Sequence, residues 1–299
     1  MKLTRLITLS LLGASVSLLF LTPASAQNLY VANYGYIGEY DATSGAAIST
    51  SLVGIPNSSL ELAISGNDLF VANYGNNTIG KYDATSGTAI SSSFISGLNS
   101  PIALAISENH LFVANWDSIG VYDATSGAAI STSLVSGLNG PRALAISGND
   151  LYVANYGSSS IGKYDATSGA AISTSLVTGL NGPWGLAISG NDLFVANFMR
   201  NTIGKYDATS GAAISTSFIS GLNYPIGLAI SENHLFVAND GMIGEYDATS
   251  GAEISSSLVS GLHWPGSIAT QDVPEPSTYA LFGIGAIGLL MVMRRKKTA

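Results

Sequence analysis

Short runs of alternating apolar and polar residues fill the middle of the chain and return at a nearly fixed distance. In the fourth copy the runs cover 185–189, 193–197, 202–207 and 213–219. Val, Ile, Phe and Tyr dominate the runs, and Gly, Asn and Asp separate them, which is typical of short strands joined by turns. Because the connections are short, we expect neighbouring strands within each copy to be antiparallel.

A repeated Tyr-Asp-Ala-Thr-Ser-Gly string marks six repeats. Successive tyrosines of the string are 40 or 42 residues apart, a period that fits a four-stranded propeller blade. The pattern therefore predicts an all-β fold, a six-bladed β-propeller of four-stranded antiparallel blades over residues 27–271. The marker tyrosines are Tyr40, Tyr82, Tyr122, Tyr164, Tyr206 and Tyr246.

The two ends of the repeat region complement each other. The first repeat starts at residue 28 with the pattern of a second strand and has no first strand. The missing pattern lies at 265–270, after the sixth repeat. We therefore expect a C-terminal strand to join the N-terminal blade and to close the ring. A ring explains why one repeat cannot stand alone, since each blade buries both faces against its neighbours.

The repeats resemble the YVTN and NHL propeller families over about residues 28–271. The resemblance rests on the Leu-Phe-Val-Ala-Asn strand, the Ile-Gly-Lys-Tyr-Asp strand and the Thr-Ser-Gly turn. It implies the propeller fold and leaves the function open, because propellers carry many functions.

Residues 1–26 have the features of a secretory signal peptide. Two basic residues precede a long apolar stretch, and Ala24 and Ala26 form a small-residue cleavage site. We expect the secretion machinery to export the chain and signal peptidase to cut before Gln27. An uncleaved membrane anchor is the alternative.

Residues 272–299 contain three successive features. Pro274, Glu275 and Pro276 precede an apolar run over 279–293. The run is shorter than the roughly 20 residues that a spanning helix usually needs, but a short transmembrane helix is expected if the bilayer thins around it. A basic end follows and predicts a cytoplasmic C-terminus. It consists of Arg294, Arg295, Lys296 and Lys297.

This three-part tail resembles the PEP-CTERM sorting signal of Gram-negative bacteria. The resemblance implies that an exosortase in the inner membrane recognises the tail, cuts near the motif and releases or transfers the protein to the cell surface or the medium. Such proteins are often linked to exopolysaccharide or biofilm matrix. A plain C-terminal membrane anchor is the alternative.

Composition excludes several classes of function. The chain has no cysteine, which excludes a disulfide scaffold, a thiolate zinc site and a thiol nucleophile. Between the charged ends, five basic residues stand against nineteen acidic ones, a net charge of −14. Such an acidic body argues against binding nucleic acid through its phosphates. No cofactor is expected.

Acidic residues and histidines are the other candidates for chemistry. Each Asp of the repeated string is expected to cap its own turn, with the Gly supplying a positive φ. His110 and His234 lie in equivalent turns three repeats apart, and His263 lies in another loop, so the histidines predict no catalytic constellation. Glu61 replaces a small residue of the first strand and is the one candidate for a cation site. The second-strand asparagines are candidate neighbours, but their recurrence in every repeat favours a backbone-capping role instead. Such a site belongs to a lactonase-like, metal-dependent hydrolase.

The copies differ most in the loop that precedes the first strand and in the loop that follows the second strand. In an antiparallel blade both loops lie on one edge of the ring, which we call the variable rim. Aromatic residues beside arginine are typical of recognition surfaces. We therefore predict a face for polysaccharide or for another surface protein. Its residues are Tyr34, Trp116, Arg142, Trp184, Phe198, Arg200, Tyr224 and Trp264.

Three functions remain open at this point. The leading one is an exported, non-enzymatic propeller that binds or scaffolds extracellular matrix. The second is the metal-dependent hydrolase with a cation near Glu61. The third is a structural surface protein without a ligand, in which the variable loops have drifted.

Overall fold

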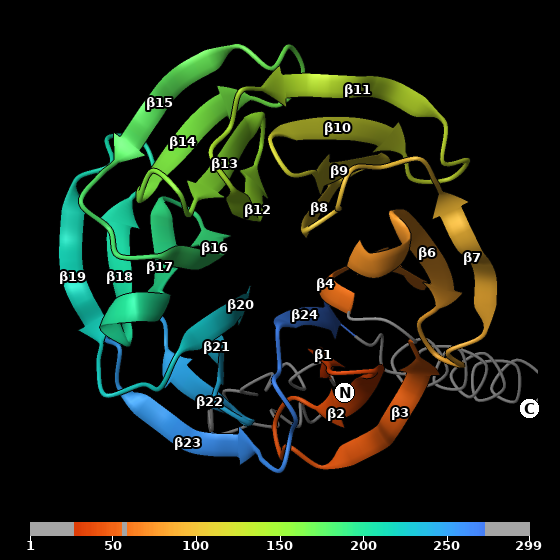
Figure 1. Cartoon of the computed structure of the whole chain (residues 1–299). Helices are drawn as coiled ribbons and strands as arrows, with labels where there is room; N and C mark the ends of the chain where they lie inside the picture. The colour runs from red at the N-terminus through yellow and green to blue at the C-terminus, as the bar shows by residue number, and fades with distance from the viewer. Residues whose placement is uncertain (1–26, 56–58, 273–299) are drawn as a thin grey trace, which may run out of the picture. The chain divides into compact units, whose positions relative to one another are not determined.

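The computed structural model describes residues 27–55 and 59–272. Within them, six four-stranded antiparallel sheets form the blades of a ring (Figure 1). The signal peptide with Ala24 and Ala26, the motif Pro274–Pro276, the expected transmembrane helix and the basic end lie outside the described residues. No helix within the described ranges is long and apolar enough to cross a membrane.

The blades are numbered along the chain, and their strands are given from the channel outward. Blade 1 consists of β24 (Ser267–Asp272), β1 (Gln27–Asn33), β2 (Tyr36–Asp41) and β3 (Ala47–Gly54). Blade 2 consists of β4 (Ser59–Ser65), β5 (Asp68–Asn73), β6 (Thr78–Asp83) and β7 (Ala89–Ile95). Blade 3 consists of β8 (Ala103–Ser107), β9 (His110–Ala114), β10 (Ser118–Asp123) and β11 (Ala129–Ser136).

The second half of the ring repeats the same order. Blade 4 consists of β12 (Pro141–Ser147), β13 (Asp150–Asn155), β14 (Ser160–Asp165) and β15 (Ala171–Val177). Blade 5 consists of β16 (Pro183–Ser189), β17 (Asp192–Asn197), β18 (Thr202–Asp207) and β19 (Ala213–Ile219). Blade 6 consists of β20 (Pro225–Ser231), β21 (His234–Asn239), β22 (Met242–Asp247) and β23 (Glu253–Val259). Short 3-10 helices η1 (Tyr74–Asn76) and η2 (Phe198–Arg200) follow β5 and β17.

The ring closes where the sequence predicts. Strand β24 pairs antiparallel with β1, with Ile268 opposite Val31, and takes the innermost place in blade 1. The pairing continues to Asp272, two residues beyond the 265–270 pattern and one beyond the expected end of the propeller at 271. The fold class and the C-terminal closing strand are thereby confirmed.

The core lies between neighbouring blades rather than inside any one of them. In the interface of blades 4 and 5, for example, Ala143 and Ile161 pack with Leu193 and Val195 in one buried cluster. Because every blade buries both faces in this way, apolar surface is fully covered only in the closed ring.

A glycine in each third strand makes room for the marker tyrosine. At Gly80 an added Cβ would lie 2.6 Å from a ring carbon of Tyr82, so only glycine lets the ring cover the strand. Tyr82 is buried, and the same close contact recurs in the other five blades. The Gly-x-Tyr spacing is therefore a packing requirement of every blade.

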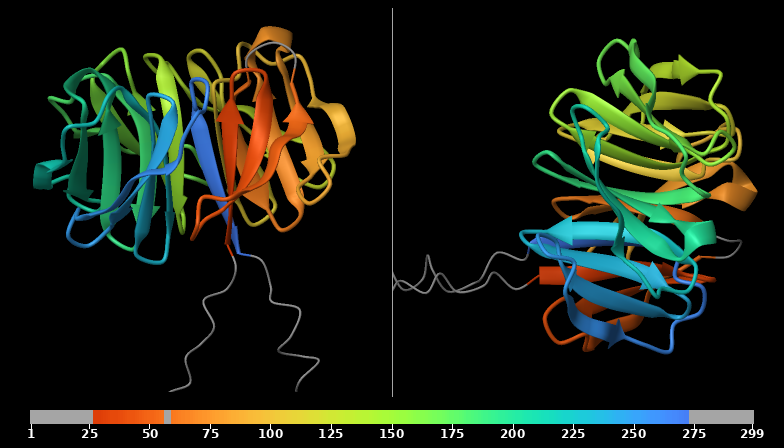
Figure 2. Two further views of the ribbon diagram at one scale, coloured as in Figure 1. Left: turned by 90° about the horizontal axis from the view of Figure 1, so that it is seen from below. Right: turned by 90° about the vertical axis from the view of Figure 1, so that its left-hand side faces the viewer.

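The ring has two edges with different loops. On one edge lie the turns between the first and second and between the third and fourth strands, and we call it the turn rim. Strand β1 starts and β24 ends on the turn rim, where Gln27 pairs with Asp272. Helices η1 and η2 lie on the opposite edge, the variable rim (Figure 2, right).

Candidate functional site

The aspartates of the turn rim stabilise their own turns, as the sequence predicts. In blade 4, Asp165 Oδ1 accepts hydrogen bonds of 2.7 Å from both the backbone N–H and the hydroxyl of Ser168. Gly169 follows with φ of 72°. These hydrogen bonds favour the ionised carboxylate and hold the pKa of Asp165 below its usual value. The same turn forms in each of the other blades at Asp41, Asp83, Asp123, Asp207 and Asp247.

Each blade contributes only one of these aspartate turns, so the carboxylates of the turn rim are too far apart to form an ion site. Across residues 27–55 and 59–272 no three His, Cys, Asp or Glu side chains come together as metal ligands. His110 and His234 begin the second strands of blades 3 and 6, and His263 lies on the other rim against Tyr34.

Three buried lysines on the third strands form contacts that sequence reasoning missed. Lys81 Nζ lies 2.8 Å from the carboxylate of Asp68 in its own blade. It also donates a 3.0 Å hydrogen bond to the carbonyl of Ala124 in the next blade. The pairs Lys163–Asp150 and Lys205–Asp192 repeat the 2.8 Å contact. Each lysine therefore joins two blades at the turn rim.

Where the lysine is replaced, its partner changes with it. In blade 6 the corresponding residue is Glu245, and His234 Nδ1 lies 2.6 Å from its carboxylate. In blade 1 it is Glu39, which accepts a 2.6 Å hydrogen bond from Asn28. Burial raises the pKa of Glu39. The two positions change together between repeats, and this paired change is the feature of the sequence from which their contact could have been inferred.

Glu61 lies beside the closing strand, and its neighbours differ from the expected ones. Ser267 donates a 2.6 Å hydrogen bond to Glu61, whereas no asparagine contacts its carboxyl group among the described residues. Burial raises the pKa of Glu61 to about 8. The carboxyl group is therefore mostly neutral at pH 7 in the metal-free protein, so a cation would have to displace its proton in order to bind.

The second-strand asparagines bind backbone instead. Asn115 Oδ1 accepts a 3.3 Å hydrogen bond from the backbone N–H of Asn99, and Asn197 Oδ1 does the same for Asn181 at 3.4 Å. Asn239 Oδ1 accepts from the backbone N–H of Asn223 in the same way. These three amides hold the loops that precede the first strands, which is the backbone-capping role that their recurrence in every repeat predicts.

On the variable rim, five side chains from blades 4, 5 and 6 form one continuous row, which we call the aromatic stack. The guanidinium carbon of Arg142 lies 4.7 Å from the ring centre of Trp184. Trp184 lies 5.6 Å from Tyr156 and 5.0 Å from Phe198. The row ends at Tyr224, 5.1 Å from Phe198. Residues up to 42 positions apart contact each other here because the loops of successive blades share one edge.

Arg142 has no charged partner in the described part of the chain. It forms no ion pair and no hydrogen bond there, and its Nε is enclosed without an acceptor. The two Nη groups are not enclosed. Stacking on the indole uses the flat face of the guanidinium and leaves the N–H groups in its plane free to bind a carboxylate. The arrangement is an unpaired cation set in an aromatic row.

The other predicted residues of the variable rim lie outside the stack. Trp116 is 56% exposed on blade 3, and Trp264 is 60% exposed at the entry to blade 1. Tyr34 is also exposed and contacts His263, while Arg200 is exposed at the end of η2. All three tryptophans therefore lie on one rim, but only Trp184 belongs to the row.

Two aromatic residues of this rim adopt a backbone conformation that normally requires glycine. Tyr224 and Trp264 both have φ of 53°. The corresponding residues in blades 4 and 5 are Gly140 and Gly182, which share the positive φ. Bulky residues in this region cost about 1–3 kcal/mol each. Two further non-glycine positions of this kind, Glu108 and Glu232, lie on the turn rim.

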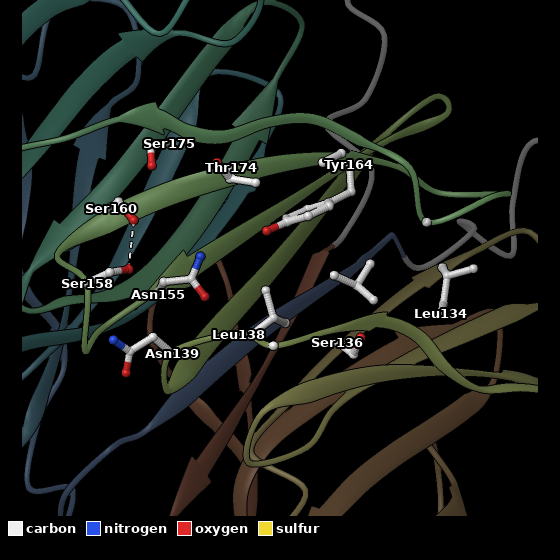
Figure 3. Close-up of a pocket in the computed structure, with 14 residues that line it drawn as sticks. Leu134, Ser136, Leu138, Asn139, Asn155, Ser158, Ser160, Tyr164, Thr174 and Ser175 are labelled. Atoms are coloured by element: carbon white, nitrogen blue, oxygen red, sulfur yellow. Dashed lines mark hydrogen bonds between the residues drawn. The ribbon is translucent and has the colours of Figure 1, made fainter.

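A polar hollow of about 490 Å³ lies between blades 3 and 4 near the variable rim (Figure 3). Asn139, Asn155, Ser158 and Ser160 line it, and the two serine hydroxyls lie 2.9 Å apart. Its lining contains hydroxyls and amides but no Asp, Glu, His or Lys side chain. The hollow therefore presents no base beside a nucleophile.

Comparisons with known proteins address the two parts of the chain separately. The family model for the PEP-CTERM protein-sorting motif matches residues 272–296. Among solved structures, a chain of the nidogen/laminin complex superposes with a TM-score of 0.70 at 16% identity, covering 82% of this chain and 98% of that one.

At that identity the likeness concerns the fold alone. A computationally designed protein, Ika8, matches with a TM-score of 0.45 at 19% identity, covering 81% of this chain and 76% of that one, too low to support an argument. No curated protein sequence matches the chain. The protein is thus a six-bladed β-propeller that carries at its C-terminal end a PEP-CTERM sorting motif, the signal that directs a chain to exosortase.

Proposed function

We propose that the mature propeller is a non-enzymatic matrix protein that binds a carboxylated polysaccharide through the aromatic stack. The observation that carries this proposal is the contact between Arg142 and Trp184 within a row of four aromatic rings. Aromatic faces pack against the apolar faces of sugar rings, and the guanidinium binds a carboxylate with two parallel hydrogen bonds.

Export is the second part of the proposal. Signal peptidase removes residues 1–26, and exosortase processes the tail near Pro274–Pro276 to deliver the ring to the extracellular matrix. The ring starts and ends on the turn rim, where Gln27 pairs with Asp272. The variable rim lies opposite that edge and is the surface that we assign to the ligand.

The strained aromatic residues support this assignment. Tyr224 belongs to the stack and keeps a positive φ where two other copies have glycine. Strain that stability does not require is typical of binding sites. Because the strain holds the tyrosine ring 5.1 Å from Phe198, it extends the row by one residue.

Affinity electrophoresis through gels that contain polygalacturonate tests the binding site. We expect Trp184→Ala to weaken the retardation about tenfold, since it removes the central ring. Trp116→Ala is the matched control, because that indole is exposed on the same rim outside the stack. Equal losses in the two variants contradict the stack as the site.

The carboxylate is tested separately with fully methyl-esterified polygalacturonate, which has the same sugar rings without the charge. We expect weaker binding of the ester by the native protein and no discrimination by Arg142→Gln. Arg200→Gln removes an equal charge from the same rim and serves as the control. Retention of both polymers by all variants identifies a neutral-sugar site, and retention of neither by the native protein overturns the proposal.

A structural coat without a ligand is the competing function, and the near identity of six turns favours it. It predicts no retardation by any polysaccharide and no capture of another surface protein. The hydrolase alternative predicts stoichiometric metal in the purified protein, and metal-free protein counts against it.

A further inference from the structure

A second hollow of about 490 Å³ lies between blades 3 and 4 on the turn rim, away from the aromatic stack. Phe112, Val121 and Ile146 provide apolar lining, and Glu108 and His110 provide polar groups. Ala166 of blade 4 lines it from the other side. The hollow occupies the place where a buried lysine joins the blades elsewhere in the ring.

The lysines of other blades show what this place binds. In blade 5, Lys205 Nζ lies 2.8 Å from Asp192 and donates a 3.0 Å hydrogen bond to the carbonyl of Ala248. The same ammonium lies 5.3 Å from the ring centre of Phe194 and 5.0 Å from that of Phe218. A carboxylate, a carbonyl and aromatic faces together are the groups that stabilise a desolvated ammonium.

Blade 3 keeps most of this environment but lacks the ammonium. Val121 pairs with Phe112 in the register in which Lys205 pairs with Phe194. The carbonyl of Ala166 corresponds to that of Ala248, and no described residue donates a hydrogen bond to it. The valine side chain ends well short of the length of a lysine, which leaves the hollow.

The negative charge in blade 3 comes from a different position. His110 replaces the aspartate, and Glu108 takes the place that Gly66 and Gly148 hold in blades 2 and 4. Glu108 keeps a positive φ of 54° and makes no ion pair with any described residue. A carboxylate therefore lines the hollow together with the imidazole of His110.

We propose that this hollow binds a primary alkylammonium group, which replaces the missing lysine. The ammonium donates to the Ala166 carbonyl and to His110 or Glu108, and its alkyl chain packs on Phe112 and Val121. The site is independent of the function proposed for the aromatic stack. A free amine and the side chain of a partner's lysine share this chemistry.

Calorimetric titration of the purified protein with n-butylammonium chloride at pH 7 tests the site. We expect one equivalent to bind, and n-butanol, which has the same length without the charge, to bind at least about tenfold more weakly. Equal binding of the alcohol, or no binding of the ammonium, overturns the proposal. Nα-acetyl-lysine amide against its norleucine analogue shows whether a tethered lysine also enters.

Two sets of substitutions make the test specific to this place. His110→Asp with Val121→Lys copies the pair of blade 5 into blade 3, and we expect it to abolish binding because its own lysine fills the hollow. Gly190→Glu with Asp192→His and Lys205→Val copies blade 3 into blade 5, including the carboxylate of Glu108, and we expect two equivalents to bind. Unchanged stoichiometry in both variants contradicts the assignment.

Discussion

The two rims of the ring differ in how closely the six copies agree. On the turn rim, every copy keeps the same hydrogen-bonded aspartate turn, and changes at the buried lysine position come in pairs. On the variable rim the loops differ from blade to blade, and several of the substituted residues are strained or unpaired. The first pattern is what packing requires, whereas the second contains residues that stability alone does not explain.

This contrast separates two meanings of a difference between repeats. At the turn rim the change to Glu245 is compensated by a neighbour, His234, whereas the change to Val121 leaves a hollow. On the variable rim compensation is incomplete, since burial raises the pKa of Glu61 despite its hydrogen bond from Ser267, and Trp264 has a positive φ. Reverting an uncompensated residue is therefore expected to stabilise the ring, and breaking a compensated pair to destabilise it.

The largest expected loss of stability comes from opening the ring, because this disrupts the turn rim and the variable rim together. Truncation after Ser260 deletes β24 and leaves β1 without its partner in blade 1. We expect loss of cooperative unfolding, because the exposed faces of blades 1, 2 and 6 lose their cover. Thermal unfolding by circular dichroism measures it. Truncation after Pro274, which keeps β24, is the control, and equal melting of the two proteins contradicts the seam.

The next largest effect is the contribution of Glu61 to the pH dependence of the free energy of unfolding. Its pKa is about 8 in the folded ring against 4.5 in the reference state, so between those values the folded protein holds a proton that the unfolded chain has released. The free energy of unfolding therefore falls as pH rises from 4.5 to about 8 and then levels off. The shift corresponds to at most about 5 kcal/mol.

Glu61→Gln has no proton to lose and retains an amide oxygen for Ser267. We expect the variant to be more stable than the native protein at pH 8 and nearly equal to it at pH 4. Denaturant unfolding at the two pH values measures the difference. A parallel pH dependence in both proteins contradicts the buried neutral carboxyl group.

A smaller effect is expected from a compensated pair on the turn rim. Lys163→Glu places two carboxylates together at Asp150 and loses the interblade contact, at a cost of about 3 kcal/mol. Adding Asp150→His reproduces the pair of blade 6, and we expect it to restore most of the loss. Denaturant unfolding of both variants and of Asp150→His alone completes the cycle. Additive losses contradict the pairing.

The smallest expected change in the free energy of unfolding comes from relieving backbone strain on the variable rim. Trp264 is 60% exposed and has a positive φ, so Trp264→Gly removes strain at little loss of packing. We expect a gain of about 1 kcal/mol in the free energy of unfolding. Trp116→Gly, which lies at no positive φ, is the control and is expected to bring no gain. A loss of stability at Trp264 shows that its indole packs more than its exposure indicates.

The ring could be predicted from the amino-acid sequence alone. The 40- or 42-residue period, the four strand patterns and the displaced first strand predict the blades and their closure, because strand alternation and turn chemistry are local properties. The Asp-Ala-Thr-Ser-Gly turn was predictable for the same reason, since donor and acceptor lie within four residues.

Which side chains meet across blades depends on the folded ring. Arg142 and Trp184 are 42 positions apart, and Glu61 and Ser267 are 206 positions apart. The raised pKa of Glu61 and the hollow at Val121 follow from those neighbours and from burial, neither of which the residues of a single repeat specify. Period and turns are fixed within a repeat, whereas contacts, charge states and cavities depend on the blade next to it.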